Sequence, residues 1–417
     1  MVSRRHFIRT ATGSAVGLAA SPLLGSSGAR VLAHQTDDWY GVQQAFSVDR
    51  SLIHLNSGGV CPAPTSVLRS LSAHQAASNR RPFYAHESEV LPQIESIRGR
   101  LAATIGCDPE EIALTRNTSE GMEICQLGIE LNPGDEILTT DHDYPRMLAT
   151  WGQRAAREGI RIRRVAVPVP LSDPTALVTS ISDAITDRTR LIMCCHVVDL
   201  TGQILPVAEI VAAGHAKGIK VLVDGAQSFG HIPFRLADLG CDFFATSLHK
   251  WMMGPEGTGL LYVRRDLIRH VWPLMPAEDG LEDNIRKFED TGTKCHAPAL
   301  AVAEALQFHE GIGCPEKFER VRFLRDYWLD GLMDQDRIEL LTDVTRAGSL
   351  ATIAVEGLNP GKLRSHLWNQ FRIRVRPIEQ ENVSGIRVSP GIYTTLPELD
   401  RFIAVMKTIL NDGIPTT

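Results

Sequence analysis

Residues 190–223 read RLIMCCHVVDLTGQILPVAEIVAAGHAKGIKVLV, and their pattern decides the fold. Two short apolar runs flank a stretch in which apolar residues recur at helical spacing. Pro206 near the start of that stretch and Gly218 just past its end are typical helix boundaries. This strand–helix–strand order predicts parallel strands whose sheet is covered by helices on both faces.

The alternation continues along the chain in both directions. Further apolar runs predict strands at 111–115, 136–139, 161–167 and 241–245. Beyond residue 300 the pattern changes to helical stretches over 300–334, short strands near 350–356, 372–378 and 385–389, and a last helix over 396–411. We therefore expect an α/β fold with a mostly parallel sheet, followed by a smaller C-terminal α+β domain.

The composition excludes several classes of protein. The chain has 417 residues, of which 43% are hydrophobic and 22% charged, and these values argue against a disordered, collagen-like or coiled-coil chain. The 43 Lys and Arg are outnumbered by 49 Asp and Glu, which argues against nucleic acid as a partner. The eight cysteines form no C-x-x-C pair, so no metal site is predicted.

The N-terminus has the features of an export signal. Arg4 and Arg5 precede a mildly apolar run over 11–24, and small residues end the segment at Ala33. We expect a Tat signal peptide over 1–33, recognition by the Tat translocase, cleavage near Ala33 and a periplasmic or extracytoplasmic location. A short hydrophobic anchor behind a chance Arg-Arg pair is the alternative.

The densest group of chemically active residues follows two predicted strands. Asp224 ends one apolar run, and Ser247, His249 and Lys250 follow another, with the glycine-rich GPEGTG at 254–259 behind them. A buried Asp needs a cationic partner, and a Lys in an apolar pocket readily becomes an amine nucleophile. The combination predicts pyridoxal phosphate (PLP), with a Lys250 aldimine, Asp224 on the pyridine nitrogen, and Ser247 and His249 donating to the phosphate. For either Asp224 or Lys250 alone, a surface position is the alternative.

The stretch from Cys241 to Leu261 resembles the lysine signature of the class V aminotransferases, which are fold-type I PLP enzymes. The similarity extends from the HLNSGG at 54–59 to the segment around Tyr393, and the HKW at 249–251 is most similar to the isopenicillin-N-epimerase-like branch. Leu248 departs from the family, which usually has a small residue there.

The resemblance also implies an architecture. We expect a fold-type I PLP-dependent transferase with a seven-stranded, mostly parallel sheet in the large domain. The expected boundaries are an N-terminal segment at 34–60 that joins the small domain, a PLP-binding domain at 61–295 and a small domain at 296–417. Thr293 matches a residue that reaches the phosphate in the neighbouring subunit, so a homodimer with shared active sites is implied; a turn hydroxyl is the alternative.

Family roles extend to residues that contact the cofactor. Thr118 and Ser119 match the phosphate loop at a helix N-terminus, although a plain helix cap is the alternative. Tyr144 stands where desulfurases have a histidine stacked on the ring, and His142 competes for this role. The Asp199 position carries Asn in much of the family, bonded to the phenolic oxygen of PLP, and an Asp there would repel a phenolate unless it is protonated or shares a proton.

The resemblance implies roles for two further residues. Gln227 matches a position that contacts the same edge of the cofactor as Asp199. Arg387 matches the arginine that pairs bidentately with the α-carboxylate of the substrate, with a surface strand Arg as the alternative. The basic residues at 372, 374 and 376 are interpreted as facing solvent and receive no role.

The reaction is predicted less closely than the cofactor. Transamination, epimerisation and C–S or β-elimination of an amino acid or peptidic metabolite all begin with proton removal at Cα by Lys250, and we rank transamination first. No cysteine lies between residue 315 and the end of the sequence, which argues against a desulfurase. A non-catalytic PLP-fold binding protein is a further alternative. An NAD(P)-dependent dehydrogenase is disfavoured, because this sequence has no G-x-G-x-x-G motif after a predicted strand.

Overall fold

The computed structural model describes residues 37–82 and 86–414. The predicted Tat signal over 1–33 therefore lies outside the described residues. Within those residues, no helix combines the length and hydrophobicity needed to span a bilayer.

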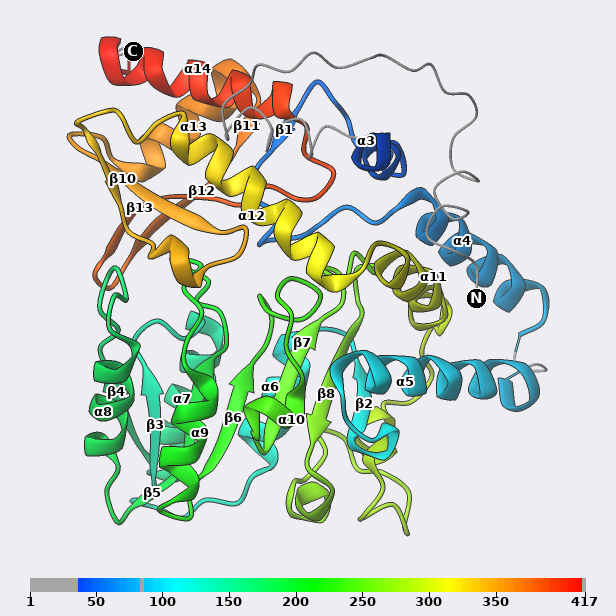
Figure 1. The fold of residues 1–417 in the computed structure, drawn as a ribbon. Coiled ribbons are helices and arrows are strands. Elements are labelled where there is room, and N and C mark those ends of the chain that lie inside the picture. The colour runs from blue at the N-terminus through cyan, green and yellow to red at the C-terminus, as the bar shows by residue number, and fades with distance from the viewer. Residues whose placement is uncertain (1–36, 83–85, 415–417) are drawn as a thin grey trace.

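A seven-stranded sheet forms the centre of the large lobe (Figure 1). Its order is β2-β8-β7-β6-β5-β3-β4, with β2 at Ile112–Thr115, β3 at Glu136–Thr140, β4 at Arg161–Val165, β5 at Thr189–Cys195, β6 at Lys220–Asp224, β7 at Phe243–Ser247 and β8 at Gly259–Val263. Strands β4, β3, β5, β6 and β7 pair in parallel, so the predicted mostly parallel sheet is confirmed. The sequence interpretation missed β8, which pairs antiparallel with β7 and β2 and was read as the end of the lysine signature.

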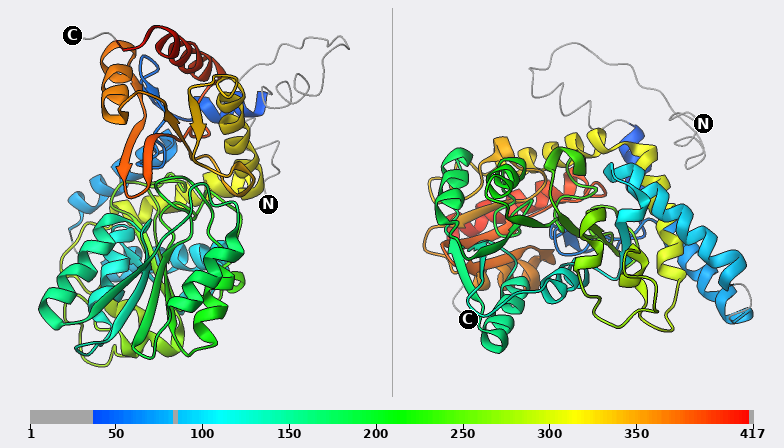
Figure 2. Two further views of the ribbon diagram at one scale, coloured as in Figure 1. Left: turned by 90° about the vertical axis from the view of Figure 1, so that its left-hand side faces the viewer. Right: turned by 90° about the horizontal axis from the view of Figure 1, so that it is seen from below.

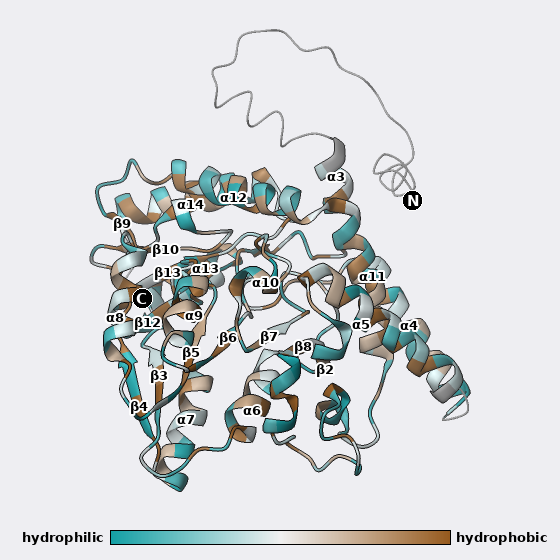
Figure 3. Ribbon diagram, turned by 60° about the horizontal axis from the view of Figure 1, so that its bottom comes forward, coloured by the Kyte–Doolittle hydropathy of each residue, from teal (hydrophilic) through white to brown (hydrophobic). Residues whose placement is uncertain are grey.

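Both faces of this sheet are buried, which explains its continuous apolar strands. In β5, Leu191 and Met193 belong to one apolar core, whereas Ile192 and Cys194 belong to the core on the other face. Successive residues of a strand point to opposite faces, so a strand covered on both sides must be apolar throughout. Figure 3 shows this as hydrophobic colour on the central strands and mixed colours along the helices.

Helices cover the two faces and the end of the sheet (Figure 2). They are α4 at Thr65–Arg80, α5 at Leu91–Ile105, α6 at Thr118–Gly128, α7 at Pro145–Glu158, α8 at Pro174–Ala184, α9 at Val207–His215, α10 at Leu236–Leu239 and α11 at Ala297–Ile312, with α3 at Asp37–Gln44 before them. Short helical turns lie at His86–Val90, Pro109–Glu111, Arg265–His270, Ile285–Glu289 and Val344–Arg346. The helical stretches predicted over 300–334 are the two helices α11 and α12, which Gly313, with φ at +95°, separates.

The C-terminal lobe has its own core around an antiparallel sheet of order β12-β13-β10-β9. Its elements are α12 at Cys314–Asp330, β9 at Ile338–Leu340, β10 at Ala351–Val355, α13 at Pro360–Phe371, β11 at Ile373–Arg374, β12 at Arg376–Gln380, β13 at Val383–Val388 and α14 at Leu396–Asp412. The short strand β1 at Ile53–His54 pairs in parallel with β11. The N-terminal part of the chain thus lies against the C-terminal lobe, as Figure 1 shows.

Candidate active site

A cavity of about 260 Å³ lies at the carboxyl ends of the parallel strands. Strand order reverses between β3 and β5, and ligands of open α/β sheets bind beside such a reversal. The structure brings together most of the predicted site residues as lining of this cavity, namely Thr118, Ser119, Tyr144, Asp199, Asp224, Gln227, Ser247, His249 and Lys250. Arg387 and Thr293 are not among the lining residues.

Asp224 and Lys250 face the cavity from neighbouring strands. Asp224 is the last residue of β6, and its Oδ1 accepts a hydrogen bond of 2.9 Å from the Ala226 amide. Burial raises the pKa of Asp224, and burial lowers the pKa of Lys250 although Asp199 and Asp224 oppose this shift. Lys250 is therefore an amine that loses its proton easily. The charged form of Asp224 would be stabilised by a cationic partner such as a pyridinium nitrogen.

The N-terminus of α6 offers a site for an anion. Asn117 caps the helix by accepting from the Glu120 amide, and the Ser247 hydroxyl lies 2.9 Å from the Thr118 amide and 2.7 Å from its Oγ1. The buried Nδ1 of His249 has no hydrogen-bond partner in the described part of the chain. A helix N-terminus with two hydroxyls and an open imidazole nitrogen fits a phosphate, so these residues fit the predicted cofactor.

Asp199 is an ionised carboxylate held by two arginines. Its Oδ1 accepts from Arg387 Nη1 at 2.5 Å and from Gln227 Nε2 at 2.7 Å, and its Oδ2 accepts from Arg376 Nη1. Burial acts to raise the pKa of Asp199, but Arg387 and Arg376 outweigh it and hold the pKa well below its usual range. The two arginines compensate the charge of Asp199, while its predicted place beside the phenolic oxygen of PLP stays a prediction.

Arg387 lies directly behind the cavity wall. Its guanidinium is fully buried and also donates from Nη2 to Asn56 at 2.7 Å. Gly58 lines the cavity in front of it, and a Cβ added at Gly58 would lie 3.0 Å from Arg387 Nη2. Glycine at this position lets the guanidinium pack close to backbone that lines the cavity, while the predicted contact with a substrate carboxylate stays a prediction.

His142 and Tyr144 both line the cavity but differ in burial. The Tyr144 side chain is 40% exposed, whereas His142 is 1% exposed and its Nε2 is bonded to Asn382 Oδ1 at 2.7 Å. The other amide atom of Asn382 donates to the Val167 carbonyl at 3.2 Å. A buried ring held in one orientation is the better platform for stacking, so the geometry favours His142, the competing candidate, for this role.

Sequence reasoning missed three contributors to the site. From the sequence alone, Arg376 is interpreted as facing solvent, and neither Asn56 nor Asn382 receives a role. Arg376 stands directly opposite Arg387 in the β12–β13 ladder. Recognising the two-residue connection between these strands would have revealed this pairing. Thr293 is exposed, and nothing in the single chain tests its predicted contact with another subunit.

Comparison with known proteins identifies relatives that cover nearly the whole chain. The family model for class-V aminotransferases matches residues 53–402. An isopenicillin N epimerase of Streptomyces clavuligerus is 30% identical over 394 residues, which are 90% of this chain and 99% of that protein. A cysteine desulfurase of Haloferax volcanii is 30% identical over 380 residues, covering 84% of this chain and 88% of its own.

Solved structures show the same fold. A complex of the cystine C–S lyase C-DES with its product cysteine persulfide has a TM-score of 0.79 at 27% identity, covering 88% of this chain and 99% of that one. A C-DES variant with glycine covalently linked to its PLP cofactor has a TM-score of 0.80 at 26% identity, covering 89% and 99%.

Proposed function

Because this chain belongs to the class V aminotransferase family, whose cofactor is PLP, we propose that it removes the Cα proton of an amino-acid-like substrate with Lys250 as the base. The observation that carries the proposal is the position of Lys250, which shares one cavity with Asp224 and has a pKa lowered by burial. When bound, PLP withdraws electrons from Cα and so makes that proton removable.

The residues of this chain divide the remaining work. Asp224 is placed to hold the ring nitrogen, and the first turn of α6 with Ser247 and His249 is placed to hold the phosphate. Arg387, which packs against Gly58 at the edge of the cavity, is the proposed partner of the substrate α-carboxylate. Holding the carboxylate and the ring orients the Cα–H bond toward Lys250.

The fate of the proton distinguishes two reactions. Transamination, ranked first from sequence, needs Lys250 alone to move the proton between two atoms of the substrate and cofactor. Epimerisation needs a second group to return a proton on the opposite face, and His142 supports it as the second candidate. Because the Asn382 amide donates to Val167, its oxygen accepts from His142 Nε2–H, and Nδ1 is the nitrogen placed to take a proton from one epimer and to return one to the other.

His142 Nδ1 is buried and has no partner among the residues that the structure describes. Its ring follows β3, whereas Lys250 follows β7, and strands β6 and β5 lie between them in the sheet. The isopenicillin N epimerases among the relatives add support to this second candidate.

Persulfide chemistry of the desulfurase relatives does not fit this chain. Cys195 lines the cavity, but burial, together with the charges of Asp143 and Asp224, raises the pKa of its thiol well above the usual value. A thiol that holds its proton is a poor nucleophile. Elimination needs no such cysteine and shares the first proton transfer with the two candidates above.

The proposal also includes assembly and location. Export through the Tat translocase rests on Arg4 and Arg5, and a homodimer rests on Thr293, which is exposed and lies outside the lining of its own cavity. Sedimentation of the purified protein, and localisation after replacing both arginines by lysine, test these two parts.

Exchange of the Cα proton tests the central reaction. PLP-loaded protein is incubated in D2O with pools of amino acids, and loss of the Cα–H signal is followed by NMR. Lys250→Ala should slow exchange about a hundredfold or more, whereas Lys217→Ala on the surface should not. Chiral chromatography and mass spectrometry then detect D-isomers and keto acids, and His142→Gln should remove only the former. Undiminished exchange in Lys250→Ala would overturn the proposal.

A further inference from the structure

We propose that Asp199 selects the substrate by charge: it neutralises one of two arginines at the cavity, so the site accepts one carboxylate and rejects an acidic side chain. The substrate class is then an amino acid or peptidic metabolite with a free α-carboxylate and an uncharged or amide-blocked side chain. This inference rests on the proposed function, because Arg387 is taken there as the partner of the α-carboxylate.

The two arginines are forced together by the β12–β13 hairpin. Arg376 and Arg387 are directly opposite residues in the antiparallel ladder. Opposite residues of an antiparallel pair project from the same face, and like charges at such positions repel. The pair is therefore stable only with an anion beside it, and Asp199, which follows β5 in the other lobe, supplies that anion.

The anion joins the pair symmetrically. One oxygen of Asp199 accepts from Arg387 and the other from Arg376, so the carboxylate bridges the two guanidinium groups. Gln227 fixes its orientation through a hydrogen bond of 2.7 Å, and the Gln227 amide is itself held by the Gly58 carbonyl and by Trp251. Hydrogen bonds from Arg376, Arg387 and Gln227 therefore fix the position of the Asp199 carboxylate.

Counting charges defines what the site can accept. Two arginines and one aspartate leave a single uncompensated positive charge, which one substrate carboxylate neutralises. A second carboxylate would bring an excess negative charge next to Asp199 in a largely buried place, where like charges discriminate strongly between ligands. An acidic side chain is therefore rejected by repulsion, even though two arginines are present.

Both arginines keep donors that no described residue uses. Arg387 Nε is buried and has no partner within the described residues. Arg376 lines the cavity with its side chain 29% exposed, and Asp199 is its only side-chain hydrogen-bond partner in the described ranges. Both guanidinium groups therefore have donors available for a substrate carboxylate, in addition to those that bind Asp199.

Binding of two simple acids to PLP-loaded protein tests the selection. Butyrate carries one carboxylate and glutarate carries two, and calorimetry gives the dissociation constant of each. Wild-type protein should bind butyrate at least as tightly as glutarate. Asp199→Asn keeps the shape and the Gln227 bond but leaves two positive charges, so the preference should move toward glutarate by about tenfold or more.

A second variant moves the charge in the other direction. Arg376→Gln leaves Arg387 and Asp199 neutral together, and butyrate binding should weaken about tenfold. Glu381→Gln is the matched control, because it removes a carboxylate that pairs with Arg164 at 3.7 Å, outside the cavity, and it should leave the ratio of the two constants unchanged.

The outcomes separate this inference from the proposed function. An unchanged ratio in Asp199→Asn, a wild-type preference for glutarate, or a lack of binding of both acids to wild-type protein overturns the role of Asp199. If Arg387→Ala binds butyrate as tightly as wild-type protein while Asp199→Asn changes the ratio, the carboxylate site assigned to Arg387 is wrong and the charge selection stands on Arg376.

Discussion

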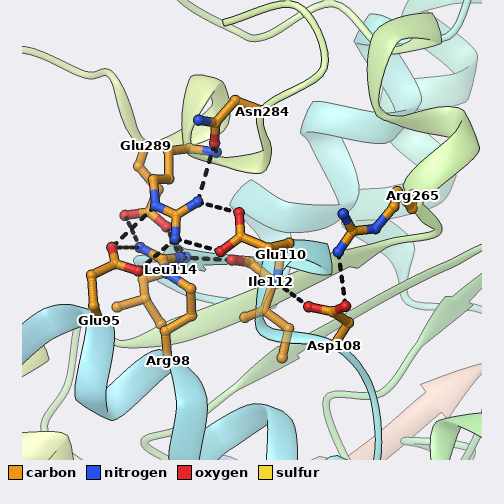
Figure 4. Close-up of polar contacts among 10 residues, drawn as sticks. Glu95, Arg98, Asp108, Glu110, Ile112, Leu114, Arg265, Asn284 and Glu289 are labelled. Carbon is orange, nitrogen blue, oxygen red and sulfur yellow. Dashed lines mark hydrogen bonds and ion pairs between the residues drawn. The ribbon is translucent and has the colours of Figure 1, made fainter.

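Two clusters of arginine and carboxylate side chains are built differently in this molecule. The closed cluster joins Arg98 and Arg286 to Glu95, Glu110 and Glu289, so three negative charges face two positive charges (Figure 4). The open cluster at the cavity consists of Asp199, Arg376 and Arg387, so one negative charge faces two. The closed cluster therefore has a net negative charge and no uncompensated arginine. The open cluster has a net positive charge, which an anionic ligand can neutralise.

Burial alone does not separate the two clusters. Arg98 is 1% exposed and Arg387 is 0% exposed. Every nitrogen of Arg98 has a partner: Nε and Nη2 donate to Glu95 at 3.1 and 3.0 Å, and Nη1 donates to the Ile112 carbonyl and to Glu289. Arg387, in contrast, leaves its buried Nε unpaired within the described chain. An unpaired donor on a buried arginine is costly, and a substrate carboxylate would remove that cost.

The largest expected effect concerns the closed cluster. Arg98→Met removes the cation that ties α5 to β2 and to the turn at Ile285–Glu289, and it leaves Glu289 without its arginine. Breaking a buried pair from one side should lower the free energy of unfolding by about 3–5 kcal/mol, measured with urea. Turnover per folded molecule should not change, because no residue of this cluster lines the cavity.

Arg269→Met provides the control for that measurement. Arg269 pairs with Asp283 on the surface, with side chains 58% and 67% exposed, and its loss should cost less than about 1 kcal/mol. Equal costs for the two variants would show that the closed cluster has no special structural role.

The second expected effect concerns the open cluster. Arg387→Ala should lose about 2–4 kcal/mol of transition-state binding, which is a fall in kcat/KM on the order of a hundredfold. The visible absorption of PLP should persist, because the residues placed to hold it lie elsewhere in the cavity. Arg387→Lys should not restore activity, since an ammonium cannot replace the planar fork. A normal kcat/KM in Arg387→Ala would remove the distinction between the clusters.

Lys317 is a third buried cation, and its hydrogen-bond partners are a carbonyl and an imidazole rather than a carboxylate. Lys317 donates to the Trp251 carbonyl at 2.6 Å and lies 3.0 Å from His309 Nδ1, and burial lowers its pKa from 10.5 to about 8. Between pH 8 and 10.5 the unfolded chain binds more protons than the folded one. Stability should therefore rise with pH across this window by about 1–3 kcal/mol.

Lys317→Met removes this dependence. The variant should be more stable than wild-type protein at pH 7 by the same amount, and urea unfolding at pH 7 and pH 10 measures both values. A wild-type protein whose stability is flat over that window would mean that Lys317 keeps its ordinary pKa despite its burial.

Six of the seven strands of the large sheet, and helix α9, could be predicted from the sequence to within a few residues. Parallel strands buried on both faces show as continuous apolar runs, and helix ends show as Pro and Gly, so each signal lies within about twenty residues of sequence. Strand β8 was not predicted, because its short apolar run directly follows the glycine-rich GPEGTG and was interpreted as part of the lysine signature.

The open cluster could be predicted only in part. The sequence points to Asp199 and Arg387, whereas Arg376 is interpreted as facing solvent and receives no role. The antiparallel register places it opposite Arg387, and register depends on the whole hairpin rather than on the residue. The sequence does not decide between His142 and Tyr144 for the stacking role. Local sequence does not show that Asn382, at the tip of the β12–β13 hairpin, contacts His142.

By itself, the sequence determined the class of fold and the family, and it singled out most of the residues that the structure brings to one cavity, because each of these rests on patterns of neighbouring residues. Only the tertiary structure decided which charges meet. Asp199 lies 177 positions from Arg376 and 188 from Arg387, and His142 lies 240 positions from Asn382. Partners so distant are chosen by how the two lobes pack, and the sum of their charges, which sets what the cavity accepts, exists only once the chain has folded.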